Sequence, residues 1–142
     1  MKKDDKILYF ESAKIELTSV DFKIIKNDEN SSGSPKKIIT KDSINLQELN
    51  YDFFTLRYER KVQLDPISLF DISVKYEVTF KFSKDTINEY KDNLEELNVV
   101  VNEKLEKALL LTNVISRASN IISNITMQLN GNAIITPPSI QK

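Results

Sequence analysis

The sequence predicts an α+β fold in which helices pack on one face of a four-stranded antiparallel sheet. Apolar residues alternate with polar ones through residues 10–82, and they recur every three or four positions through residues 86–130. Strand patterns that all precede the helix patterns favour an antiparallel sheet with helices to one side. We expect one domain over residues 1–142, with the sheet in 10–82, the helices in 86–130 and an extended segment in 131–142.

Residues 10–25 predict the first strand, with an irregularity in the middle. The apolar residues change phase along it, from Ile15 and Leu17 to Val20, Phe22 and Ile24. A change of phase inside a strand indicates a β-bulge, here near Ser19. Residues 26–37 are rich in Asn, Ser, Asp and Gly and predict a loop.

The next three strands differ in the strength of their patterns. Ile38, Ile39, Ile44 and Leu46 lie in polar sequence and predict only an extended segment and a short strand. Residues 53–64 alternate clearly, with Arg60 as the one charged residue on the apolar phase. After a turn, residues 70–82 alternate without interruption, so the two segments predict an antiparallel hairpin with one apolar face.

Helix signals begin after the hairpin. Thr86 with Glu89 three residues later matches a capping box. The buried stripe that follows steps by three or four residues from Leu94 to Leu129. A run of β-branched residues at 99–101 predicts a break there, giving a shorter and a longer helix. Asn130 and Gly131 predict the C-terminal cap of the second helix.

Composition excludes most enzyme chemistry. The chain has no Cys and no His, which excludes disulfides, Cys or His zinc sites and nucleophile–histidine pairs. No phosphate-binding loop is present, and adjacent carboxylates such as Glu95 and Glu96 diverge on a helix. A net charge of -1 offers no basic surface for nucleic acid. We therefore expect no catalytic residues, no metal and no cofactor.

The beginning of the chain lacks a targeting signal. The apolar run at residues 7–10 is too short for a signal peptide. We expect a cytoplasmic protein that does not insert into a membrane.

The long helix carries more apolar residues than one sheet face needs. Four of them lie outside its main stripe: Leu109, Leu110, Val114 and Ile121. Either these residues are buried more deeply in one chain, or they contact a second copy. We favour the second interpretation, with a dimer or tetramer.

A second candidate site lies beside the polar loop. Ile38, Ile39, Ile44 and Leu46 would line an apolar groove there, or they are ordinary core residues of a short strand. Phe53 stands on the polar phase of its strand, where it is either a binding residue or an isolated surface aromatic.

Three local patterns accompany the order of elements: Leu109-Leu110-Leu111, the internal Arg117, and Asn130-Gly131 followed by Ile134-Ile135-Thr136-Pro137-Pro138. In these patterns and in its order of elements, the sequence resembles the SecB family of export chaperones over residues 10–140. The sequence departs from the family in three respects. Residues 113–115 stand where the family has an aromatic-proline-aromatic motif, the strong acidity of the family is absent, and so are its last helix and tail. Because that tail helps to contact the SecA motor, client binding is the better supported expectation than delivery for export.

The resemblance implies an ATP-independent holdase that binds unfolded polypeptides in apolar grooves of a homotetramer. The client-binding residues would be Phe22, Ile38, Ile39, Ile44, Leu46 and Phe53. A chaperone dedicated to one antitoxin of a toxin-antitoxin system is a narrower alternative. A non-catalytic assembly subunit, which uses the same apolar helix only to oligomerise, is an alternative from another class.

Overall fold

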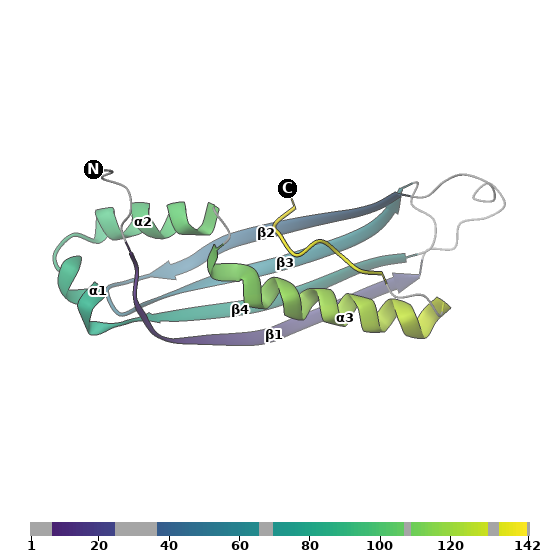
Figure 1. Ribbon diagram of the computed structural model, residues 1–142, viewed down its shortest axis with the longest axis horizontal. Coiled ribbons are helices and arrows are strands. Elements are labelled where there is room, and N and C mark those ends of the chain that lie inside the picture. The colour runs from purple at the N-terminus through teal and green to yellow at the C-terminus, as the bar shows by residue number, and fades with distance from the viewer. Residues whose placement is uncertain (1–6, 25–36, 66–69, 107–108, 131–133, 142) are drawn as a thin grey trace.

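The structure is a computed structural model that describes residues 7–24, 37–65, 70–106, 109–130 and 134–141 (Figure 1). A long, flat sheet forms one layer, and the helices lie together on one of its faces. The last described residues, 134–141, return from the end of the long helix and cross the same face over two strands.

The four strands form one antiparallel sheet, which confirms the predicted α+β fold. They are β1 (Phe10–Ile24), β2 (Lys37–Leu49), β3 (Phe53–Asp65) and β4 (Phe70–Phe82). Their spatial order is β1-β4-β3-β2, so β3 and β4 are central and β1 and β2 are the outer strands. The predicted loop at 26–37 lies almost entirely outside the described residues.

The predicted bulge in β1 is confirmed, whereas the prediction for β2 was too short. The pairing of β1 with β4 shifts register between Leu17 and Ser19, where the apolar phase changes. β2 is a continuous strand of 13 residues that pairs with β3 along its length. Its pattern was weak because Asp42 stands on the apolar phase in the middle of the strand.

The core lies between the helices and the central strands. Alternate residues of β3 and β4 are 0–7% exposed, from Phe54 to Val62 and from Ile72 to Phe82. At one end of the sheet Phe10 of β1 packs on Phe54, Phe80 and Phe82, with ring centroids 5.0–5.9 Å apart. These side chains supply most of the apolar burial that stabilises the fold.

Among the described residues after the sheet, the chain forms three α-helices and one 3-10 turn. They are α1 (Lys84–Glu89), α2 (Leu94–Glu106), η2 (Leu109–Leu111) and α3 (Thr112–Asn130). The predicted capping box at Thr86 is wrong, because Ser83 caps α1 and Thr86 lies inside it. Thr86 is buried, and its hydroxyl accepts a hydrogen bond from the Tyr9 amide at 2.8 Å. It ties the chain before β1 to α1.

The break between helices also lies elsewhere than predicted. α2 runs through residues 99–101, because Val100 and Val101 are 4% and 0% exposed, and their burial outweighs the weak helix preference of valine. The helices are interrupted instead on both sides of α2, which ends at Glu106 before η2. On its N-terminal side the chain turns at Asp92, which has φ of 64°, and Asn93 caps α2. The Asn93 side chain accepts from the Glu96 amide and donates to the Glu96 carboxylate. α3 ends at Asn130 as expected, and the predicted glycine cap at 131 lies outside the described residues.

The helices cover less of the sheet than its full width. In β1, Leu17 and Val20 pair with the core residues Tyr76 and Val74, so they point to the helix side, yet they are 50% and 39% exposed. In β2, Ile38 is 50% exposed on the same side. Within the described residues, no helix is long and apolar enough to cross a membrane.

We predict that Asn93→Ala lowers the free energy of unfolding by about 1 kcal/mol, because it removes the N-terminal cap of α2. Asn93→Asp keeps an acceptor at this position and should be nearly neutral. Urea denaturation followed by circular dichroism measures both. Equal stabilities of the alanine variant and the parent protein would show that the cap contributes nothing.

Candidate functional site

A buried arginine stands where the helices, the outer strand β2 and residues 134–141 meet. Arg60 lies on β3 among the core residues, and its side chain is fully buried. Its register partner on β2 is Asp42, also with a fully buried side chain. A buried charge needs a partner and complete hydrogen bonding, so the surroundings of Arg60 define a site.

The pair is bidentate. Arg60 Nε donates to Asp42 Oδ1 and Nη2 donates to Oδ2, each at 2.8 Å. The Asp42 amide donates to the Gln141 carbonyl at 2.7 Å instead of to β3. The two residues therefore face each other at a position without ladder hydrogen bonds, where side chains of antiparallel strands lie closest together.

The other guanidinium donors point at residues 134–141, here called the C-terminal segment. Nη1 lies 2.6 Å from the Pro137 carbonyl and 3.0 Å from the hydroxyls of Thr136 and of Ser119 on α3. Nη2 lies 2.9 Å from the Ser139 carbonyl. Arginine has five N–H donors, and all of them find acceptors here.

The carboxylate of Asp42 is equally well satisfied. It accepts from the Tyr58 hydroxyl at 2.7 Å and from the Gln141 amide at 2.8 Å, besides the two bonds from Arg60. Burial, reinforced by the hydrogen bond to Asp42, raises the pKa of Tyr58 above its ordinary value. Burial by itself would lower the pKa of Arg60, but Asp42 and Tyr58 raise it overall. Tyr58 is thus a neutral donor and Arg60 a cation.

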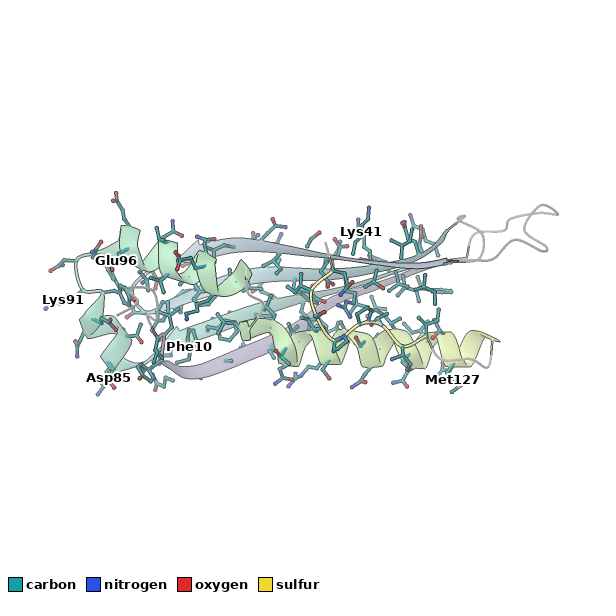
Figure 2. The ribbon with its side chains drawn as sticks, turned by 45° about the horizontal axis from the view of Figure 1, so that its top comes forward. Phe10, Lys41, Asp85, Lys91, Glu96 and Met127 are labelled. Atoms are coloured by element: carbon teal, nitrogen blue, oxygen red, sulfur yellow. The ribbon has the colours of Figure 1, made fainter. Side chains whose placement is uncertain are left out.

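The C-terminal segment is held at both ends as well as in the middle. The Ile134 amide donates to Thr126 of α3 at 2.8 Å. At the other end Gln141 pairs with Asp42 at the outer edge of β2. In Figure 2 Lys41, the neighbour of Asp42, points away from the helices, on the opposite side of the sheet from the segment.

The predicted client-binding residues divide between the two faces of the sheet. Ile38, Ile44 and Leu46 of β2 and Phe22 of β1 point to the helix side. Two others, Ile39 and Phe53, point to the opposite face. The structure therefore brings three of the four β2 residues together, and a groove lined by all four does not form.

A shallow hollow adjoins one end of β2. Its volume is about 340 Å³, and it is lined by Leu46, Gln47, Glu48 and Leu49 of β2 and by Leu94, Glu95 and Asn98 of α2. Leu46 and Leu49 are half-buried and pack on the core, while Leu94 is 37% exposed. The apolar side of β2 therefore borders α2 here, and not the long helix α3.

The four predicted interface residues differ in exposure. Val114 is 1% exposed and belongs to the core of its own chain. Leu110 and Ile121 are half-buried at the edge of that core. The side chain of Leu109 lies outside what the structure describes. Oligomerisation itself stays a prediction, and Leu110 and Ile121 are the residues through which to test it.

Sequence reasoning noticed Arg60 but missed its partners. Asp42 stands in the same alternating phase as Ile38, Ile44 and Leu46. A single acidic residue on an apolar phase was the signal that could have predicted its pairing with Arg60. No signal pointed to the C-terminal segment, whose bonds to Arg60 come mainly from backbone carbonyls. Among the described residues no group of three or more acidic residues is placed to hold a metal ion.

No protein-family model and no curated protein matches the sequence. Among solved structures, the chain is similar to the Rv1957 SecB-like chaperone of Mycobacterium tuberculosis, solved in complex with a ChAD peptide from the Rv1956 HigA1 antitoxin. The TM-score is 0.49 at 6% identity, over 88% of this chain and 86% of that one. It is also similar to a protein of unknown function from Streptococcus agalactiae, with a TM-score of 0.40 at 10% identity, over 89% and 98% of the two chains.

We predict that Asp42→Ala lowers the free energy of unfolding by about 3–5 kcal/mol, because it leaves the Arg60 charge buried without its partner. Lys41→Ala, at the exposed neighbouring position, is the matched control and should change stability by less than about 0.5 kcal/mol. Chemical denaturation measures both. A loss below about 1 kcal/mol for Asp42→Ala would mean that water reaches the guanidinium and replaces the carboxylate.

Proposed function

We propose that the protein is an ATP-independent holdase of the SecB-like class, which binds extended apolar segments of unfolded polypeptides on the helix side of its sheet. The binding surface would be the uncovered outer part of that side, principally on β2. The proposal includes no catalytic step and no cofactor, and it places the protein in the cytoplasm.

One observation carries the proposal: the apolar face of the sheet is wider than the helices that cover it. The helix-side residues of the central strands are nearly fully buried, whereas Leu17, Val20 and Ile38 on the outer strands are 39–50% exposed. Exposed side chains aligned on strands can contact alternate side chains of an extended peptide. The outer edges of β1 and β2 also offer backbone groups to such a peptide. The sequence resemblance to the SecB family points the same way.

The apolar surface is sufficient for weak, general binding. Burying one isoleucine or leucine fully contributes roughly 1.5–3 kcal/mol before the cost of ordering the client. Ile38 already has half of its surface exposed, and the half-buried Ile44 and Leu46 extend the same side of β2. Two or three such contacts supply roughly 3–9 kcal/mol, so the roughly 8 kcal/mol of a micromolar complex also requires backbone pairing at the strand edge. Binding by several weak apolar contacts distinguishes unfolded chains from folded ones without specificity for a particular client sequence.

We predict that Ile38→Ser weakens binding of an unfolded polypeptide about five- to thirty-fold, because it removes an exposed apolar contact. Ile39→Ser is the matched control, because it makes the same substitution at the next residue, which lies on the opposite face of the sheet. Fluorescence anisotropy with labelled β-casein, an unfolded chain without cysteine, measures the affinities. Suppression of the aggregation of a heat-denatured protein, without ATP, tests the activity.

Two outcomes contradict the proposal. If the parent protein neither binds β-casein nor slows aggregation at stoichiometric ratio, it is not a general holdase. A chaperone dedicated to one client, such as an antitoxin, would then be tested with the proteins encoded beside it. If Ile38→Ser and Ile39→Ser weaken binding equally, the client does not lie on the helix side of β2.

A non-catalytic assembly subunit is the second candidate. Leu110 and Ile121 favour this function, because they are only half-buried at the border of the core. Their exposed parts could contact a second copy. In that case the exposed residues of β1 would contact another copy instead of a client.

We predict that the parent protein is a dimer or tetramer by light scattering, and that Ile121→Glu dissociates it, because a charge in an apolar contact is costly. Val114→Glu is unsuitable, since Val114 lies in the core of its own chain and the variant would unfold. Ser116→Glu, at an exposed position of α3, is the control. A parent protein that is monomeric at micromolar concentration would exclude the assembly function.

A further inference from the structure

The C-terminal segment crosses the surface that the proposed function assigns to clients. The residues of β2 that point to the helix side form a row: Ile38, Thr40, Asp42, Ile44 and Leu46. The segment contacts this row at Asp42, its middle member. It therefore divides the row into an exposed part at Ile38 and a half-buried part at Ile44 and Leu46. Figure 1 shows the segment lying across β2 and β3.

Arg60 and Asp42 form hydrogen bonds mainly with backbone atoms of the segment. Arg60 donates to the carbonyls of Pro137 and Ser139, and Asp42 exchanges two bonds with the backbone of Gln141. Only Thr136 contributes a side chain to Arg60. Any extended polypeptide has carbonyls and amides at this repeat, so the site has no strict requirement for the sequence that occupies it.

The segment has little apolar surface to hold it in place. Ile135 is 79% exposed, and Pro138 and Ser139 are exposed. Ile134 and Ile140 pack partly on the core, and Thr136, at 5% exposed, is buried through its polar contacts. Segments that depend on a few hydrogen bonds with little burial open at low free energy, well below that of global unfolding. Opening removes the segment's acceptors from Arg60 and admits water in their place, whereas the pair with Asp42 joins β2 to β3 and does not depend on the segment. The charge thus retains its counterion when the segment leaves.

We propose that residues 134–141 are an internal occupant of the client site, which an extended segment of an unfolded polypeptide displaces. The carbonyls of the client replace those of Pro137 and Ser139 on Arg60, and its apolar side chains contact Ile38 on one side and Ile44 on the other. This inference rests on the proposed holdase function. It adds that the protein exchanges part of its own chain for the client, so that the middle of the site, at Arg60 and Asp42, is covered when no client is present.

A reversible crosslink tests the displacement. The hydroxyl oxygens of Ser119 on α3 and Thr136 on the segment lie 2.6 Å apart, close to the length of a disulfide bond of about 2.05 Å. Because the chain has no Cys, the double variant Ser119→Cys, Thr136→Cys can form only this disulfide within one chain. Mass spectrometry under denaturing conditions confirms its formation. The same polypeptide is then measured oxidised and reduced, which cancels the effect of the substitutions themselves.

We expect the oxidised variant to bind labelled β-casein at least about ten-fold more weakly than the reduced variant. The crosslink keeps the segment in the site, so the open state that can bind a client is no longer populated. Equal affinities of the two forms would overturn the displacement, since the segment would then stay in place while the client binds. That outcome leaves the holdase function standing. Failure of the parent protein and of the reduced variant to bind β-casein would instead refute the holdase function itself.

A second variant tests the same exchange without a crosslink. Thr136→Val removes the hydrogen bonds of the Thr136 hydroxyl with Arg60 and Ser119, so the segment opens more often and β-casein should bind several-fold more tightly. Ile135→Val is the control, because the Ile135 side chain is 79% exposed and has no hydrogen-bonding group. Unchanged or weaker binding by Thr136→Val counts against the displacement. Susceptibility of the segment to carboxypeptidase, with and without β-casein, gives an independent readout of its release.

Discussion

The burial of one positive charge constrains how the outer part of this fold is built. Arg60 is fully buried on a central strand, and a guanidinium in such a place is tolerated only when each of its donors is satisfied. Asp42 supplies the counterion from β2, Ser119 supplies a hydroxyl from α3, and the C-terminal segment supplies carbonyls. The Arg60 side chain therefore contacts β2, α3 and residues 134–141. Its hydrogen bonds depend on the register of β2 on β3, on the position of α3 and on the path of residues 134–141.

Periodicity predicted the parts of the structure that are determined within one segment. The bulge near Ser19, the hairpin of β3 and β4 and the buried stripe of α3 each follow from the spacing of apolar residues. The position of the helix break was missed because the burial of Val100 and Val101 overrides their propensity, while the capping pair at Asn93 and Glu96 was overlooked. Local patterns thus fixed the type of each element better than its ends.

The candidate site was harder to predict, because it depends on contacts between distant parts of the chain. Arg60 and Asp42 are 18 positions apart and meet only through the register of two strands. Arg60 and Ser139 are 79 positions apart, and the contact uses a backbone carbonyl that any residue possesses. The side of the sheet on which Ile39 and Phe53 lie also depends on register, since a shift by one residue reverses the face of every side chain.

The bond between the Asp42 amide and the Gln141 carbonyl has a consequence for self-association. β2 is an outer strand of 13 residues, long enough to pair edge to edge with the same strand of another molecule and to start a growing fibre. Gln141 occupies a hydrogen-bonding position in the middle of that edge and leaves only short stretches on either side. Two copies cannot then align their edges continuously. The bond to Gln141 thus interrupts the outer edge of β2 and shortens the stretch that a second molecule could pair with.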